Sequence, residues 1–95
     1  MAVRVIIDRK VKREKATELS KLPRELRSKA IPAKGYISGE TLRSLDDPQN
    51  YVVITTWQSV DDWKTWERDR ERKKIQARIE GLMSRPTKAR IYVYA

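Results

Sequence analysis

The chain has 95 residues, of which 39% are hydrophobic and 37% are charged, and this predicts a single domain (residues 1–95) with one small core. It contains neither cysteine nor histidine, which excludes disulfides, cysteine nucleophiles, the Ser-His-Asp triad and the usual zinc, haem and iron–sulfur sites. Because no glycine-rich phosphate loop is present either, we expect no metal and no other cofactor. The 22 Lys and Arg residues outnumber the 13 Asp and Glu residues, and the net charge of +9 indicates a basic, solvated surface.

The first predicted strand covers residues 3–10. Val3, Val5 and Ile7 alternate onto one face, whereas Ile6 and Asp8 share the other. The apolar stretch around this strand is too short for a signal peptide, and no run reaches the ~20 apolar residues of a membrane span. We therefore expect a cytoplasmic protein without a membrane partner.

A helix is predicted from residue 15 to about residue 29. Its apolar residues recur at three- and four-residue spacing and form one stripe: Ala16, Leu19, Leu22, Leu26 and Ala30. Pro23 interrupts this stripe, and a proline inside a helix removes a backbone donor at a cost of about 3 kcal/mol. The sequence therefore predicts a kink, or two short helices that meet near Pro23.

Two further strands are predicted at residues 35–43 and 51–57. The second of them, YVVITTW, consists entirely of β-branched and aromatic residues, which are typical of strands. Residues 44–50 (SLDDPQN) lie between them and are rich in turn-forming side chains. This arrangement predicts a β-hairpin.

The second helical region begins after Ser59, whose hydroxyl is placed to cap the first turn. Trp63 and Trp66 lie three residues apart and share one helix face. Asp69 is a candidate start for a second helical segment, because residues 67–74 contain no apolar residue to bury. Beyond this stretch the apolar stripe resumes.

Residues 89–94 (ARIYVY) form the last predicted strand, so the order of elements is β-α-β-β-α-β. This order predicts an α+β, ferredoxin-like fold in which helices cover one face of a four-stranded antiparallel sheet. The strands at 51–57 and 89–94 carry apolar residues toward both faces. Because the chain supplies helices for only one face, we expect a homodimer in which a second copy covers the other.

The segment from Gly35 to Trp66 resembles the antibiotic biosynthesis monooxygenase domain, which belongs to the dimeric α+β barrel superfamily. The features that carry the resemblance are Gly35-Tyr36 at the start of a strand, Gly39 within it, the Asp/Pro/Asn turn, Tyr51-Val52 and Thr56-Trp57 at the ends of the next strand, and the helix start with Trp63 and Trp66. The first and last strands fit this pattern as well, so the resemblance covers nearly the whole chain.

The resemblance implies a homodimer whose two sheets pack face to face as a dimeric α+β barrel, with a pocket in each subunit between helices and sheet. It also implies either cofactor-free oxygenation of phenols and hydroquinones or degradation of haem. The chain departs from the haem-degrading branch, since Gln76 stands ten residues after Trp66 where that branch has a histidine ligand, and Asp8 stands where it has an asparagine. We therefore do not expect haem degradation.

Five residues are candidates for a functional site. Trp63 and Trp66 can stack on a planar substrate, or they can simply pack in the core. Tyr36 and Tyr51 can donate a phenolic hydrogen to a bound substrate, or they can lie at an interface with their hydroxyls in water. Asp8 is the candidate catalytic base that deprotonates a hydroquinone, and the alternative is a carboxylate at a strand end paired with a neighbouring cation. In the first case we expect Asp8 and Trp66 to face each other across one pocket.

These observations predict a cofactor-independent monooxygenase that acts on a small aromatic, hydroquinone-type molecule. The alternative is a non-catalytic dimer of the same fold that binds a small ligand or serves a structural role, which the absence of a histidine base favours. Nucleic-acid binding is a third hypothesis, raised by the clustered cations. We do not expect it, because the middle strands lack the aromatic-glycine signature of an RNA-recognition sheet.

Overall fold

The computed structural model describes residues 1–95 and confirms the predicted β-α-β-β-α-β order, with each helical region divided in two. In chain order the elements are β1 (Val3–Lys10), a 3-10 turn η1 (Arg13–Lys15), α1 (Ala16–Leu19), α2 (Leu22–Ala30), β2 (Tyr36–Arg43), β3 (Asn50–Trp57), α3 (Val60–Glu67), α4 (Arg70–Glu80) and β4 (Lys88–Val93). None of the helices combines the length and the hydrophobicity that a membrane crossing requires.

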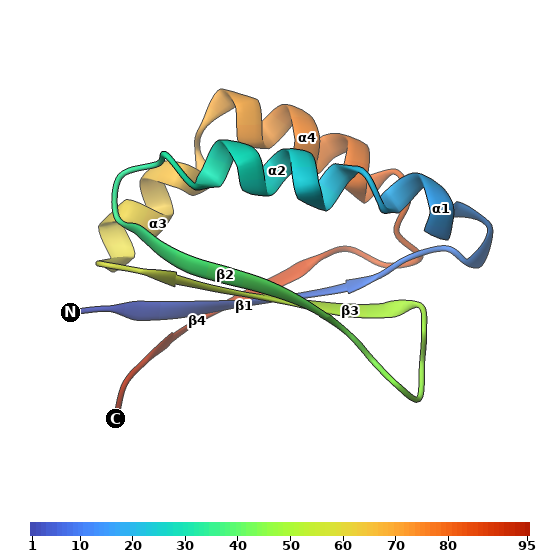
Figure 1. Cartoon of the computed structure of the whole chain (residues 1–95), viewed down its shortest axis with the longest axis horizontal. Coiled ribbons are helices and arrows are strands. Elements are labelled where there is room, and N and C mark those ends of the chain that lie inside the picture. The colour runs from blue at the N-terminus through green and yellow to red at the C-terminus, as the bar shows by residue number, and fades with distance from the viewer.

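The four strands form a single antiparallel sheet in the order β2-β3-β1-β4. All the helices lie on one face of this sheet, and the other face is bare along its whole length (Figure 1). This is the ferredoxin-like arrangement, in which the first and third strands occupy the centre of the sheet. We refer to the two sides as the helix-covered face and the open face.

Alternation along β1 decides which side chains meet the helices. Val3, Val5, Ile7 and Arg9 are buried, whereas the residues between them are partly exposed. The helix-covered face therefore carries a run of three apolar residues that ends in an arginine. The same alternation directs Asp8 to the open face.

The first helical region divides just before Pro23. Helix α1 ends at Leu19, and α2 begins at Leu22 with the proline in its first turn. A proline is tolerated there because the amides of a first turn have no partner within the helix. Of the two predicted outcomes, the structure thus adopts the pair of short helices.

The second helical region divides at Asp69, as predicted. The Oγ of Ser59 caps α3 by accepting a hydrogen bond from the backbone N of Asp62 at 3.1 Å. The Oδ1 of Asp69 caps α4 by accepting one from the backbone N of Arg72 at 3.1 Å. Each cap satisfies an amide that the helix leaves free, and the second fixes the first turn of α4, which carries Arg72.

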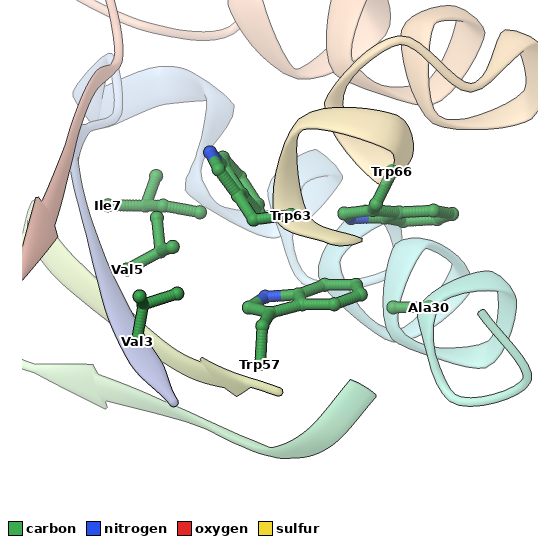
Figure 2. Packing of buried hydrophobic residues seen from close by; sticks show 7 residues of the cluster. All are labelled: Val3, Val5, Ile7, Ala30, Trp57, Trp63 and Trp66. Carbon is green, nitrogen blue, oxygen red and sulfur yellow. The ribbon is translucent and has the colours of Figure 1, made fainter. Parts of the chain in front are cut away.

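Two apolar clusters fill the space between the sheet and the helices. The first consists of Val3, Val5, Ile7, Ala30, Trp57, Trp63 and Trp66 (Figure 2). The second consists of Val11, Leu19, Leu22, Ile75, Ile79 and Met83. The first cluster joins the sheet to α2 and α3, and it adjoins the cavity described next.

Candidate functional site

A cavity of about 50 Å³ lies between the sheet and the helices α2, α3 and α4. The sheet contributes the small side chains of Thr41 and Thr55 and the bare backbone of Gly39, and α2 contributes Ala30. These small residues leave space in an interior that is otherwise close-packed. At ~10–15 Å³ per water position, the volume holds about four waters, which is close to the room that one six-membered ring needs.

Aromatic side chains form the apolar wall of this cavity. Tyr36, Trp63 and Trp66 line it, and the fully buried Trp57 packs behind them. The Trp57 ring lies 5.4 Å from Tyr36, 5.9 Å from Trp63 and 6.2 Å from Trp66, measured between ring centroids. Trp57 and Trp66 stack with 26° between their planes (Figure 2), and the Trp57 indole N–H donates to the Oγ1 of Thr55 at 3.0 Å. Packing thus holds a flat apolar surface in place before any ligand arrives.

A β-bulge in β2 brings Tyr36 and Gly39 to the cavity together. The register with β3 shifts between Tyr36 and Ser38, so two residues three positions apart face the same side. A Cβ atom on Gly39 would lie 2.6 Å from the Tyr36 hydroxyl oxygen, so any side chain at this position would require the Tyr36 ring to move. Just before the strand, Gly35 has a φ of +83°, and a Cβ there would overlap the side chain of Asp62. Both glycines are therefore needed for the position of Tyr36.

Arg9 projects from β1 into the cavity wall and is only 2% exposed. Its Nη2 donates to the Oε1 of Gln76 at 2.7 Å, and the Nε2 of Gln76 donates in turn to the Oε1 of Glu80 at 2.7 Å. The Nε of Arg9 is buried without an acceptor. Burial, helped by the positive charge of Arg72, lowers the pKa of Arg9 from its ordinary value to about 10, and Glu80 opposes only part of this shift. The guanidinium therefore keeps its charge at neutral pH but is solvated poorly.

Arg72, in the first turn of α4, adds a second guanidinium to the same wall. Its Cζ lies 5.4 Å from the centroid of the Trp63 ring, in a cation–π contact. Its Nη1 donates to the backbone oxygen of Glu67 at 3.2 Å. Burial lowers the pKa of Arg72 as well, and the charge of Glu67 acts in the opposite direction.

No carboxylate in contact balances these two charges. The four salt bridges of the chain lie elsewhere, and none includes Arg9 or Arg72. The acidic residue at the cavity edge is Glu40, which pairs with Ile54 and so directs its side chain toward the open face. Arg27 on α2 brings a third cation to the lining. The cavity can thus hold a flat apolar group against the tryptophans and an anionic oxygen against the guanidiniums.

The polar side chains of the cavity wall are guanidiniums and the hydroxyls of Tyr36, Thr41 and Thr55, and this set lacks the imidazole, thiolate or clustered carboxylate ligands that metal ions prefer in proteins. Elsewhere in the chain, no three acidic side chains converge into a group that could hold a metal ion. The chemistry that this cavity offers is therefore hydrogen-bond donation and positive charge.

Three of the five candidate residues meet in this cavity: Tyr36, Trp63 and Trp66. Both tryptophans also belong to the buried core, so the two interpretations of them hold together. Tyr51 lies apart, in an adjoining surface depression of about 320 Å³ beside α1 and α2. It shares the helix-covered face with Tyr36 but not the cavity.

The prediction that Asp8 and Trp66 face each other across one pocket is wrong. Asp8 lies with Ile6 in a depression of the open face, whereas Trp66 lies above the helix-covered face. The Oδ2 of Asp8 pairs with Arg85 at 3.5 Å, and its side chain is 41% exposed. The physical reason is strand alternation, because the helices pack on the side of Ile7 and its two neighbours point away from them. Asp8 therefore cannot act as a base inside this cavity.

Sequence reasoning did not identify Arg9 and Arg72, although a signal for each was present. Arg9 continues the alternation of Val3, Val5 and Ile7, which places it on the buried face of β1. Arg72 stands three residues before the buried Ile75, which places it on the inner side of α4. Neither position attracts notice in so basic a sequence, because most of its 22 cations lie in solvent.

The sequence profile of the antibiotic biosynthesis monooxygenase family matches residues 2–78. Several solved structures share the fold over nearly the full length. A conserved protein from Methanosarcina mazei Go1 superposes with a TM-score of 0.95 at 22% identity, covering 100% of this chain and 94% of that one. Rv0793 from Mycobacterium tuberculosis superposes with a TM-score of 0.91 at 16% identity, covering 100% of this chain and 96% of that one. SnoaB, a cofactor-independent oxygenase from Streptomyces nogalater, superposes with a TM-score of 0.89 at 14% identity, covering 99% of this chain and 93% of that one.

At such identities the solved structures establish the fold alone. The family match carries more weight for the site, since every residue that lines the cavity falls within the matched range. No curated protein matches the sequence.

Proposed function

The chain belongs to the antibiotic biosynthesis monooxygenase family, and we propose that it is a cofactor-independent monooxygenase acting on a small aromatic substrate of the hydroquinone type. The observation that carries the proposal is the cavity itself, which combines an aromatic wall with the uncompensated guanidiniums of Arg9 and Arg72. Its volume of about 50 Å³ favours a single ring over a fused polycyclic system.

The cationic wall supplies the activation that this reaction needs. A neutral hydroquinone passes electrons to oxygen slowly, and its monoanion does so readily. A phenol such as tyrosine has a pKa of about 10, and an opposite charge within hydrogen-bonding range lowers such a value by roughly 1–3 units. The two guanidiniums would therefore increase the share of bound substrate that is ionised at neutral pH, without a general base in the cavity.

The bound substrate can supply all the electrons. The hydroquinone monoanion gives one electron to dioxygen, and the resulting semiquinone and superoxide combine to form a carbon–oxygen bond at the ring. The ring carbon then loses its proton, the oxygen–oxygen bond breaks and water leaves. Hydroquinone and dioxygen thus yield hydroxyquinone and water. The anionic superoxide and peroxide groups would be stabilised by the same guanidiniums that favour the phenolate.

The test is turnover of simple hydroquinones under isotopically heavy dioxygen, followed by mass spectrometry of the quinone product. One heavy oxygen atom in the product is expected from the wild-type protein. Trp66→Leu should slow the reaction by about tenfold, because the ring loses its stacking partner. Leu45→Ala is the control, since Leu45 is 96% exposed and does not line the cavity. Oxygen uptake that yields only hydrogen peroxide and an unlabelled quinone would contradict the proposal.

A non-catalytic ligand-binding dimer is the second candidate, and one observation favours it. The cavity contains no carboxylate directed inward, and Asp8 lies on the other face of the sheet. If the guanidiniums serve only to hold a ligand, aromatic molecules will bind and quench tryptophan fluorescence without any oxygen uptake.

We also propose that two copies of the chain associate through the open face. That face presents apolar side chains on several strands, among them Leu42 at 50% exposure and Tyr92 at 46%. Ile6, Val52 and Tyr92 also line a depression of about 310 Å³ there, together with four charged residues: Asp8, Arg85, Lys88 and Arg90. A stable dimer interface buries roughly 1,200–2,000 Å² in total, and a second copy of the same sheet offers a matching area.

Sedimentation equilibrium tests this association. The wild-type protein should have the mass of two chains, and Ile54→Asp, in the centre of the open face, should have the mass of one. Leu45→Asp should remain dimeric, because Leu45 lies in the turn between β2 and β3, outside that face. A wild-type mass near that of one chain at micromolar concentration would exclude the dimer.

A further inference from the structure

Arg9 is held in a state that costs free energy in the ligand-free protein. Its guanidinium is buried, its Nε has no hydrogen-bond acceptor, and no carboxylate lies within salt-bridge distance. The neutral amide of Gln76 is its one polar partner. Arg72 lies in the same cavity wall and repels it. A fold under selection for stability alone would place a neutral side chain at this position of β1.

A ligand can supply what Arg9 lacks. A guanidinium offers five N–H donors in a planar fork, and a carboxylate accepts two of them side by side. The nearby aromatic wall of Trp63 and Trp66 accepts a flat ring. Arg9 and the two tryptophans line the same small cavity, so the ring and the acid group must belong to the same small molecule.

We propose that the ligand of this cavity is an aromatic carboxylate, with its ring against Trp63 and Trp66 and its carboxylate on Arg9. This inference rests on the proposed function, because it assigns a substrate class to the same cavity. In that context the substrate is a dihydroxybenzoate rather than a neutral hydroquinone.

Two cations suit a ligand that carries one permanent negative charge and develops a second. The carboxylate neutralises Arg9, and Arg72 remains to favour ionisation of a ring hydroxyl. Glu40 does not compete for either cation, because it pairs with Ile54 and points to the open face. Glu80 reaches Arg9 only through Gln76, so it leaves the buried Nε donor without a partner.

Equilibrium binding tests the inference without any turnover. Benzoate and benzamide have the same ring and nearly the same shape, and they differ in charge. Quenching of tryptophan fluorescence at neutral pH should show that the wild-type protein binds benzoate at least tenfold more tightly, since a hydrogen bond to a charged group contributes about 10- to 100-fold in affinity. Inorganic phosphate should not displace benzoate at comparable concentration, because it has no ring to place against the tryptophans.

Two variants locate the acid group. Arg9→Met should abolish the preference for benzoate over benzamide while leaving benzamide binding within about twofold. Arg72→Met should weaken benzoate by less, about threefold, because it acts on the carboxylate at longer range. Arg13→Met is the matched control, as it removes one positive charge from an exposed site and should leave both affinities unchanged.

Equal wild-type affinities for benzoate and benzamide would overturn the inference, and so would a preference that survives in Arg9→Met. If Arg9→Met fails to fold, persistence of the preference in Arg72→Met together with its loss in Arg9→Lys still assigns the carboxylate to the fork of Arg9. The proposed function fails separately. Benzoate selectivity without oxygen uptake on any dihydroxybenzoate would leave an acid-binding site and remove the oxygenase.

Discussion

Asp8 and Arg9 are neighbours in the sequence and occupy the two most different environments in the molecule. Asp8 lies on the open face, partly exposed and paired with Arg85, whereas Arg9 lies under the helices with 2% of its surface exposed. Chemical type does not predict this difference, since aspartate and arginine are both among the residues least often fully buried. Whether a charged residue of β1 is buried therefore depends on its position in the alternation of the strand, because every second residue faces the helices. It does not depend on whether the residue is an acid or a base.

The two faces also differ in what completes them. The helix-covered face is closed by its own chain around Trp57, and it leaves one small cavity with cations in its wall. No helix covers the open face (Figure 1), which carries both apolar and charged side chains. The single chain therefore encloses a cavity on the helix-covered face by itself, whereas it leaves the open face uncovered.

The largest effect on stability is expected from removing the Trp57 side chain, which packs against the other aromatic residues of the helix-covered face. Trp57→Ala should lower the free energy of unfolding by about 3–5 kcal/mol, because it leaves a cavity beneath Tyr36, Trp63 and Trp66. Leu45→Ala should change it by less than about 0.5 kcal/mol. Urea unfolding at a fixed protomer concentration measures both values. A loss below ~1 kcal/mol for Trp57→Ala would mean that the tryptophan cluster does not hold this face together.

The next largest effect is a gain of stability, and it tests the contrast between the buried Arg9 and the exposed Arg85. Arg9→Met should raise the free energy of unfolding by about 1–3 kcal/mol, because it replaces a buried charge without a carboxylate partner by an apolar chain of similar length. Arg85→Met, on the open face, should change it by less than about 0.5 kcal/mol. Gain of stability with loss of acid binding would mark Arg9 as a functional residue. A clear loss of stability in Arg9→Met would instead assign it a structural role.

The advantage of Arg9→Met should narrow in alkaline solution. The pKa of Arg9 in the folded protein is lowered to about 10, so the penalty for burying its charge is fully present at neutral pH and declines as the pH rises through about 10. Above that pH the unfolded chain binds more protons at this position than the folded chain, and wild-type stability rises relative to the variant. Because lysines and tyrosines titrate in both proteins, the difference between the two unfolding free energies is the quantity to follow. A difference that stays constant up to about pH 11 would contradict this explanation.

The smallest effect concerns the bulge of β2. Gly39→Ala places a methyl group against the Tyr36 hydroxyl and should cost about 1 kcal/mol, because the end of the ring must move to relieve a contact of 2.6 Å. The shift narrows the cavity, so benzamide should bind about threefold more weakly. Ser38→Ala, one position earlier on the same strand and facing the open side, should affect neither quantity. Equal effects of the two substitutions would remove the role assigned to the bulge.

The sequence by itself determined the order of elements, and it did so through local rules. The alternation of β1, the position of Pro23 and the caps at Ser59 and Asp69 all depend on residues close in the chain, and each was confirmed within a residue or so. The resemblance to the antibiotic biosynthesis monooxygenase family was confirmed by the family match over residues 2–78. Trp63 and Trp66 could be selected in advance because they share one helix face, and Tyr36 could be selected for its phenolic hydroxyl; all three line the cavity.

Tertiary structure alone decided which charges enter that space. Whether Asp8 or Arg9 points inward depends on which face of β1 the helices cover, and that follows from the packing of α2 and α3 against Val3, Val5 and Ile7. The bulge that places Tyr36 beside Gly39 depends on the register between β2 and β3, which no local pattern encodes. The sequence of a single strand shows which residues share a face, because side chains alternate along it. Which of the two faces is buried depends on how the strand pairs with its neighbours and on which side the helices pack.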